Sequence, residues 1–293
     1  MVESEQLSKK EQCYKWLFYI APHHLISRIV YFITRQRGWI VKPMIEWFIR
    51  RFNVDMSDAE YPDISHYESF NKFFIRALKP EARPIVPGHK TYACPADGTV
   101  SEAGNIDAGQ IFQAKGHHYT ALELLGGDED MAALFENGRF ATIYLAPYNY
   151  HRLHMPCYGL LQKMTHVPGR LFSVAQWTVR AIPRLFARNE RLVCFFETET
   201  GPLAMILVGA INVAAIETVW SGLVTPPKGK SISSFDYSHT EKYFDKGAEM
   251  GRFNMGSTII LLTSVNVEWL QKIRAGQIVK MGELIGHIPE STA

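Results

Sequence analysis

The sequence contains only four cysteines. The four cysteines are far apart and form no Cys-x-x-Cys pair, so neither a zinc ribbon nor a dithiol motif is indicated. They are Cys13, Cys94, Cys157 and Cys194. We therefore expect free thiols in a reducing compartment.

Long apolar runs are also missing. No run approaches the roughly 18 residues that a membrane-spanning helix needs, since proline, histidine and arginine interrupt the apolar segments of residues 16–40. The polar, charged beginning is not followed by an apolar core and a small-residue cleavage site, so a signal peptide is not expected. Internal repeats and low-complexity segments are absent.

The chain has little net charge, and this charge is unevenly distributed. A formal charge of +2 gives no reason to expect a nucleic-acid partner. The first 52 residues nevertheless hold nine Lys and Arg against four Glu, and the remainder is slightly acidic. A basic N-terminal segment favours an anionic partner there.

Residues 16–52 alternate aromatic and aliphatic residues with basic ones at helical spacing, which predicts two or three short amphipathic helices. Trp16, Trp39 and Trp47 are of the type found at a lipid headgroup boundary, and nearby arginines favour anionic lipid. The alternative is an ordinary helical cap on the core. A further helix is predicted at residues 70–76, and residues 1–90 are interpreted as a helical, membrane-associating region.

From residue 91 the pattern changes to short β-rich segments separated by glycine, with helices expected at residues 122–135 and 174–186. We expect an α+β fold, in which N-terminal amphipathic helices precede a mostly antiparallel β catalytic domain over residues 91–293. Residues 276–286 are similar to the hairpins of biotinyl and lipoyl carrier domains, which suggests a barrel-sandwich-like character. The order Lys280-Met281 argues against a carrier function.

A Gly-Ser pair precedes the apolar run of residues 259–262. A hydroxyl of Ser257 that reached the preceding carbonyl would convert the Gly256–Ser257 amide to an ester, and β-elimination would then break the chain and leave a dehydroalanine. Hydrolysis of that residue gives an N-terminal pyruvoyl group. Glycine at 256 suits this attack because a missing Cβ permits strained backbone and close approach. An isolated Gly-Ser-Thr is more often a structural turn.

Two further stretches supply acid and base. Asp97 begins an Asp-Gly pair, which on its own is most often a turn cap. His151 and His154 belong to a His-x-x-His-Met-Pro segment, and their spacing differs from that of a helical zinc pair. Without a third ligand nearby, we expect no metal.

Together and in this order, the three stretches resemble the phosphatidylserine decarboxylase family, of the short prokaryotic type. The similarity runs from about residue 16 to residue 289 and includes Lys115-Gly116-His117 and residues 167–174. The family usually has Leu at the position of Met255, a replacement of similar volume outside the chemistry.

The resemblance implies a self-cleavage triad, in which Ser257 is the nucleophile, His154 the base and Asp97 the group that stabilises the imidazolium. Cleavage would give a β-chain 1–256 and an α-chain 257–293. The pyruvoyl group made from Ser257 would form a Schiff base with the substrate amine and act as electron sink, in place of pyridoxal phosphate. His151 would return the proton, because a histidine near its ordinary pKa can hold one at neutral pH. Its alternative role is a hydrogen bond to the substrate carboxylate or phosphate.

The resemblance further implies phosphatidylserine as substrate, phosphatidylethanolamine and carbon dioxide as products, and peripheral association with the cytoplasmic side of the cell membrane. It leaves a homodimer open. Two other function classes remain. A pyruvoyl decarboxylase for a soluble amino acid should lack the basic aromatic N-terminus, and a non-enzymatic lipid-binding or carrier-like β-domain would need no reactive serine.

Overall fold

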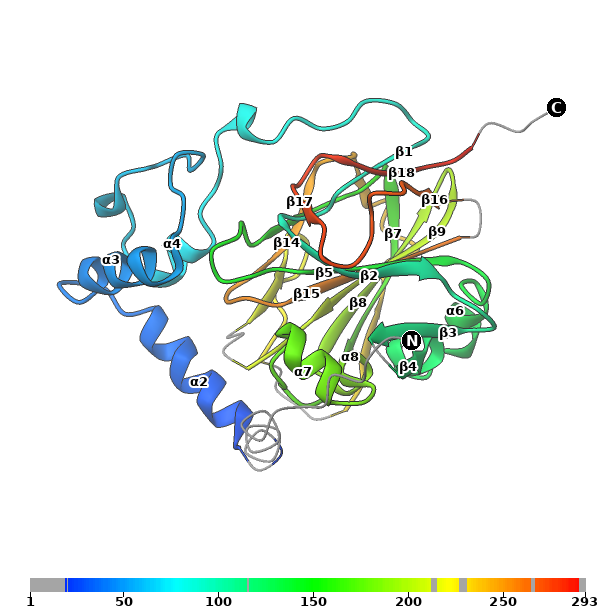
Figure 1. Cartoon of the computed structure of the whole chain (residues 1–293), viewed down its shortest axis with the longest axis horizontal. Coiled ribbons are helices and arrows are strands. Elements are labelled where there is room, and N and C mark those ends of the chain that lie inside the picture. The colour runs from blue at the N-terminus through cyan, green and yellow to red at the C-terminus, as the bar shows by residue number, and fades with distance from the viewer. Residues whose placement is uncertain are drawn as a thin grey trace, which may run out of the picture.

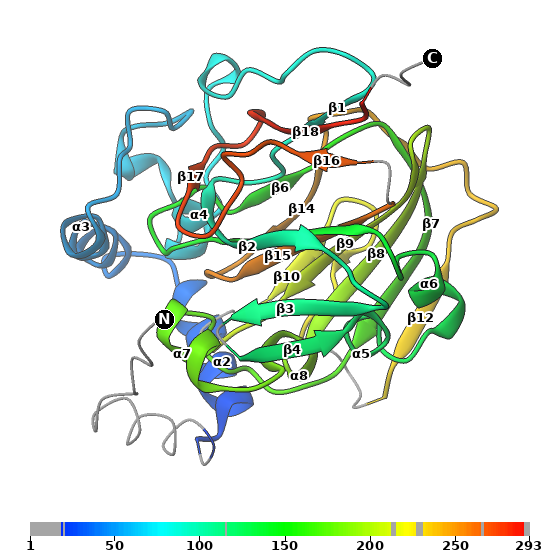
Figure 2. The same cartoon turned by 45° about the vertical axis from the view of Figure 1, so that its right-hand side comes forward.

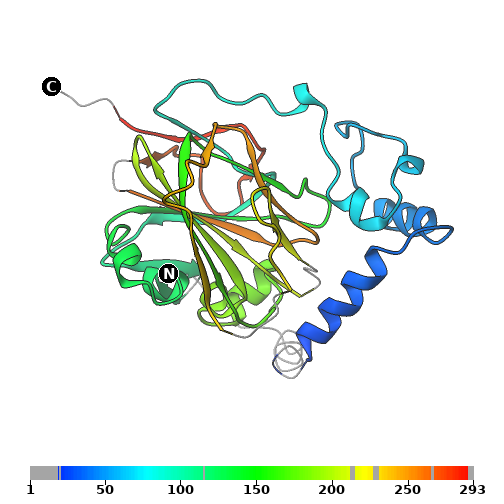
Figure 3. The same cartoon turned by 180° about the vertical axis from the view of Figure 1, so that it is seen from behind.

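The computed structural model describes residues 19, 21–114, 116–211, 215–226, 231–264 and 267–289; Trp16, Cys13 and Lys115 lie outside them. Helices α2 (His23–Thr34), α3 (Val41–Phe52) and α4 (Phe70–Phe74) precede the first strand, with short 3-10 turns η1 (Ile64–His66) and η2 (Pro80–Ala82). The helices lie beside the sheets and not over them, as the views from both sides show (Figures 1 and 3). The prediction of N-terminal helices is confirmed.

The helices have a small apolar core of their own. One face of α3 buries Val41, Ile45 and Phe48, which recur at helical spacing. The ring of Phe48 contacts Phe70 and Phe74 of α4, with centroids 5.0 and 5.9 Å apart. The partly buried side chain of Met255 packs against the same cluster. The helical region is therefore in direct contact with the residue that precedes Gly256.

In the described chain, the largest sheet has nine strands. Its order is β12-β7-β8-β9-β15-β5-β2-β17, with β13 paired to β7. The bounds are β2 (Gly98–Asn105), β5 (Arg139–Tyr144), β7 (Gly159–Val167), β8 (Arg191–Thr198), β9 (Gly201–Val208), β12 (Ser233–Asp236), β13 (Tyr243–Phe244), β15 (Thr258–Thr263) and β17 (Ile278–Val279).

Three smaller sheets complete the β region. A four-stranded sheet has the order β11 (Gly222–Leu223), β10 (Ile216–Thr218), β14 (Glu249–Phe253) and β6 (Arg152–His154). A three-stranded sheet joins β1 (Thr91–Ala93), β18 (Leu284–His287) and β16 (Glu268–Trp269), and β3 (Gln110–Ala114) pairs with β4 (His117–Thr120). Every ladder between these strands is antiparallel, as expected.

Two details bear on the expected barrel-sandwich character. β17 pairs with β2 whereas β18 pairs with β1 and β16, so residues 276–286 do not fold as the expected hairpin. The largest sheet has free edges at β12 and β17 in the described chain and does not close there. The barrel-sandwich character and the domain boundary at residue 90 stay predictions.

Each of the two helices expected after residue 120 is divided in two. Gly126 and Gly127 both have positive φ, 80° and 87°, and end α5 (Ala121–Leu124) before α6 (Glu129–Ala133). Pro183 separates α7 (Gln176–Ala181) from α8 (Leu185–Arg188). These helices and the β3–β4 hairpin lie against the largest sheet (Figure 2).

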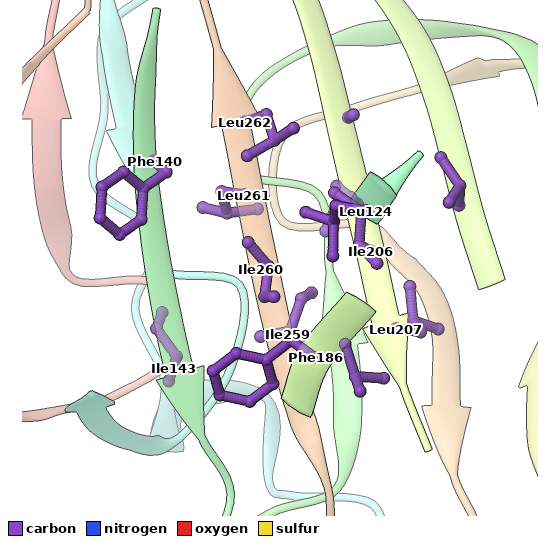
Figure 4. Close-up of a cluster of buried hydrophobic side chains, with 14 of the residues drawn as sticks. Leu124, Phe140, Ile143, Phe186, Ile206, Leu207, Ile259, Ile260, Leu261 and Leu262 are labelled. Carbon is purple, nitrogen blue, oxygen red and sulfur yellow. The ribbon is translucent and has the colours of Figure 1, made fainter. Parts of the chain in front are cut away.

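Strand β15 runs through the middle of the core. All six of its residues are buried, which agrees with the continuous apolar run in the sequence. It pairs with β5 on one side and β9 on the other. Leu124 of α5 and Phe186 of α8 pack over this part of the sheet (Figure 4). Ser257, directly before β15, is thereby attached to the most deeply buried strand.

Candidate active site

Ser257 is completely buried at the start of this strand. Its carbonyl accepts a hydrogen bond from the Leu145 N–H at 2.8 Å, which fixes the backbone beside the end of β5. Its hydroxyl has no hydrogen-bond partner among the described residues. A buried hydroxyl without a partner costs about 1–3 kcal/mol, so the site retains an unfavourable arrangement that leaves this oxygen available to react.

Gly256 lies tightly against the same neighbours. A Cβ atom at this position would lie 3.3 Å from the Leu145 carbonyl oxygen and 3.4 Å from Nε2 of His151. A side chain would therefore press on backbone that cannot easily move. The same contacts show that the structure brings His151 to the Gly256–Ser257 junction.

His151 is fully buried and presents a lone pair. Its Nδ1 lies 2.8 Å from the Asn149 carbonyl oxygen, which can only accept, so Nδ1 carries the hydrogen. Its Nε2 has no partner among the described residues. The ring packs on Phe74 with centroids 4.1 Å apart. Burial, and to a smaller extent the nearby Arg76 charge, lower the pKa of His151 to about 3, although the hydrogen bond to the Asn149 carbonyl opposes this shift.

This low pKa contradicts the expectation that His151 has a near-ordinary pKa and holds a proton at neutral pH. In the uncut chain the imidazole is neutral at pH 7, so Nε2 can accept a proton but has none to give. The sequence could not reveal this, because the desolvation comes from the fold around the ring.

His154 has both ring nitrogens occupied. Nδ1 donates to the Gly247 carbonyl at 2.8 Å, and Nε2 accepts from the Tyr150 hydroxyl at 2.9 Å. Burial lowers the pKa of His154, while the Gly247 carbonyl and the Glu249 and Asp97 carboxylates oppose this shift. No hydrogen bond joins His154 to Ser257 or Asp97 in the described chain.

Asp97 is buried in an ion pair. The Arg83 guanidinium contacts both carboxylate oxygens, at 2.6 Å from Nη2 to Oδ2 and 2.9 Å from Nε to Oδ1. The backbone N–H of Met281 also donates to Oδ1 at 2.9 Å. A backbone hydrogen bond holds the two segments together, since the His154 N–H donates to the carbonyl of Pro95, two residues before Asp97.

The Asp-Gly pair is not simply a turn. Gly98 begins strand β2, and a Cβ there would lie 2.5 Å from the Tyr144 carbonyl oxygen, so glycine is needed for the contact with β5. Sequence reasoning missed Arg83, Tyr150 and Met281 as partners of the site. Only Tyr150, four residues before His154, lies near a motif that the sequence emphasised.

An apolar groove of about 400 Å³ connects the helices to the junction. Trp47, Phe70 and Phe74 lie on the helical side, and Met255 and Gly256 lie at the junction. The other lining residues are Thr34, Met44, Phe48, Phe52, Tyr144, Leu145, Pro147, Ser173, Val174, Ala175, Ala210 and Ile211. A hydrocarbon chain would be well accommodated here.

The helices carry a second apolar surface, which faces solvent. We call it the exposed helical face: Leu25, Ile29, Phe32, Ile33, Trp39, Ile40 and Trp47. Trp39 is 90% exposed and Phe32 is 68% exposed. Several exposed apolar side chains on neighbouring helices are typical of an interaction surface.

The described residues contain no helix with the length and apolar character that crossing a bilayer demands. Among the same residues, no group of three or more His, Cys, Asp and Glu side chains is arranged to hold a metal ion.

Comparison with known proteins assigns most of the chain to one family. The family model described as "Phosphatidylserine decarboxylase" matches residues 70–287, and a model described as "PSD" matches residues 16–53. A curated protein of Pseudomonas entomophila is 53% identical over 91% of this chain and 94% of its own length. One of Shewanella frigidimarina is 52% identical over 91% and 95%. Both are named phosphatidylserine decarboxylase proenzyme.

Proposed function

The chain belongs to the phosphatidylserine decarboxylase family and is a decarboxylase, and we propose that it converts phosphatidylserine to phosphatidylethanolamine with a pyruvoyl group made from Ser257. The carrying observation is the buried, unpartnered Ser257 hydroxyl beside a glycine and a free imidazole nitrogen. Ser257 would hold the pyruvoyl group covalently. When formed, this group supplies a carbonyl that accepts the electron pair released with carbon dioxide.

The group arises from the chain itself in three steps. The Ser257 hydroxyl oxygen attacks the Gly256 carbonyl carbon, the amide C–N bond breaks, and the former amide nitrogen takes a proton to become an amine. Loss of the α-proton of Ser257 then expels the Gly256 carboxylate and leaves a dehydroalanine. Hydrolysis of the dehydroalanine then releases its nitrogen as ammonia and leaves the pyruvoyl carbonyl. The products are the chains 1–256 and 257–293.

We assign the removal of the Ser257 proton to His154, with Asp97 stabilising the imidazolium. Burial and the Arg152 charge lower the pKa of His154, but the carboxylates of Glu249 and Asp97 oppose this shift and would stabilise an imidazolium formed during the attack. The assignment requires that Nε2 exchange the Tyr150 hydroxyl for that of Ser257.

A second assignment, in which His151 removes the Ser257 proton, is favoured by proximity. Nε2 of His151 faces Gly256 without a partner, whereas Nε2 of His154 is occupied. Against it, His151 lies in a fully buried position near the Arg76 charge, where an imidazolium is unfavourable. Single variants of the two histidines distinguish these assignments.

In turnover we assign to His151 the role of general acid, which delivers a proton to the former α-carbon of the substrate. The ring is fixed by its Nδ1 hydrogen bond and by Phe74, which also lines the apolar groove. The phosphate or carboxylate of a bound substrate would raise the pKa of His151 and load Nε2 with a proton. The groove would hold an acyl chain.

We further propose peripheral association of the exposed helical face with the cytoplasmic side of the cell membrane. Aromatic residues there would enter the headgroup boundary, and the N-terminal arginines would favour anionic lipid. The proposal covers two chains from one proenzyme and leaves a homodimer open.

The test is carbon dioxide release from phosphatidylserine vesicles and from free serine. Wild type should act on the lipid, and Ser257→Ala should lose activity completely. Ser233→Ala, on exposed strand β12, is the matched control and should retain it. A Ser257→Ala protein that still decarboxylates the lipid would refute the pyruvoyl chemistry.

A further inference from the structure

We propose that a second, polar cavity binds the phosphodiester headgroup of an anionic phospholipid that is not the substrate. The cavity, of about 400 Å³, lies between the end of α2, helix α4 and the strands β10 and β14. It is separate from the apolar groove, and no residue lines both. We call it the basic cavity.

The charges that line the basic cavity do not balance. Four basic side chains and two carboxylates face it. Arg37 pairs with Glu68 at 3.2 Å, and Arg252 approaches Glu217 at 3.7 Å. Arg35 and Lys72 have no ion pair with any described residue. The Glu217 carboxylate also acts on Arg35 at longer range, and Arg252 pairs more closely with Glu249, at 3.2 Å. The lining side chains still carry an excess of two positive charges, which is the complement of a phosphate.

The Arg35 guanidinium is fixed in place while most of its N–H groups have no acceptor among the described residues. It lies over the Tyr31 ring, 3.6 Å from the centroid, and makes one long bond of 3.4 Å to the Tyr31 carbonyl. Stacking fixes the plane of the guanidinium and leaves its other N–H groups for a ligand. A planar fork of donors matches the oxygens of a phosphodiester.

The position of the basic cavity identifies a lipid as the source of that phosphate. Arg35 and Arg37 lie at the end of α2, immediately before Trp39 and Ile40 of the exposed helical face. If these apolar side chains enter a bilayer, the cavity lies at the depth of the headgroups. The inference therefore depends on the proposed membrane association, but not on the pyruvoyl chemistry.

An occupant would also touch a segment that leads to the reaction centre. Asn71 and Asn254 both line the cavity, and the Asn71 amide donates to the side-chain oxygen of Asn254 at 3.0 Å and to its carbonyl at 3.2 Å. Asn254 precedes Met255 and Gly256. A bound headgroup would therefore contact the segment that leads to Gly256.

The test is flotation of the full-length Ser257→Ala protein with phosphatidylcholine vesicles, with and without phosphatidylglycerol, so that cleavage plays no part. The double variant Arg35→Gln/Lys72→Gln is compared with Arg28→Gln/Arg51→Gln, which removes the same charge from exposed positions of α2 and α3. Surface attraction alone predicts a loss of roughly 30-fold for either pair. We expect the cavity variant to lose at least about tenfold more. Arg35→Lys, which keeps the charge without the fork, should also bind more weakly than the unmodified protein.

Equal losses for the two double variants, with unimpaired Arg35→Lys, would overturn the basic cavity as a lipid site while leaving membrane association intact. Failure of the protein to float with either vesicle would contradict the membrane association itself. Inorganic phosphate added without vesicles serves as the third arm. A rise in Tm that the cavity variant lacks would assign the site to free phosphate and overturn the lipid source.

Discussion

His154 accepts a hydrogen bond from the Tyr150 hydroxyl, with 2.9 Å between Nε2 and the phenolic oxygen, so the nitrogen assigned to serine activation is occupied before cleavage. The phenol keeps its proton, since burial raises the pKa of Tyr150. Self-cleavage by His154 must therefore include a change of partner at Nε2.

Tyr150→Phe removes this competitor and keeps the ring. Because a net hydrogen bond contributes about 1 kcal/mol, the variant should cleave as fast as wild type or up to about fivefold faster. Denaturing gels at timed intervals after synthesis would measure this. Slower cleavage would mean that the hydroxyl takes part in the proton path, and our assignment of Tyr150 as a competitor would fail.

The two histidines should differ in which event they affect. His154→Ala is expected to leave mostly uncut chain, because it removes the base. His151→Ala should cleave but retain roughly 1% of decarboxylation or less, since loss of a general acid costs 10²- to 10⁴-fold. Cleavage is measured by gel and turnover by carbon dioxide release from phosphatidylserine.

The converse result would reassign the roles. If His151→Ala stays uncut while His154→Ala cleaves, the unpartnered Nε2 beside Gly256 is the base. A His151→Ala protein that cleaves and turns over normally would remove His151 from both steps. Tyr148→Ala, in the same loop with a 48% exposed side chain, is the matched control and should cleave and turn over normally.

The sequence predicted those parts of the fold that depend on local pattern. The apolar run after Ser257 is a strand whose six residues are all buried, and the periodic residues of α3 face the helical core. Strand pairing was less predictable. The segment of β17 and β18 has the pattern of a hairpin, yet each strand pairs elsewhere, because pattern fixes which face is buried but not which neighbour is chosen.

The sequence suggested residues for the site but not their partners; their roles stay predictions, and no hydrogen bond among the described residues joins His154 to Ser257 or Asp97. Ser257, Gly256 and His151 are gathered at one junction. The partners of Asp97 were not apparent, since Arg83 lies in a proline-rich linker and Met281 lies near the far end of the chain. Such contacts depend on tertiary folding, which leaves no periodic signal in the sequence.

Acid should destabilise the uncut protein through His151. Burial lowers its pKa from 6.5 to about 3, so between these pH values the unfolded chain is protonated at His151 and the folded chain is not. The contribution is fully present above pH 6.5 and is lost as pH falls toward 3, by up to about 1.4 kcal/mol per pH unit. The free energy of unfolding, measured with urea between pH 7 and 4, should fall more steeply with falling pH for Ser257→Ala than for Ser257→Ala/His151→Gln. Equal slopes would contradict the burial of a neutral imidazole.

Membrane binding should depend on the exposed helical face. Phe32→Ala/Trp39→Ala removes two aromatic side chains that are each worth about 1.5–3 kcal/mol when buried, so vesicle affinity should fall by at least about 100-fold. Tyr243→Ala, 53% exposed on β13, is the control and should bind normally. Unchanged flotation of the double variant would show that this face does not enter the bilayer.

Intact mass under denaturing conditions tests the central claim most directly. We predict two fragments, residues 1–256 and a smaller chain 257–293, whose mass corresponds to a pyruvoyl group in place of Ser257 and whose N-terminus is blocked to Edman degradation. Ser257→Ala should give only the full-length mass. A wild-type preparation that decarboxylates phosphatidylserine while showing a single, uncut chain would contradict the account.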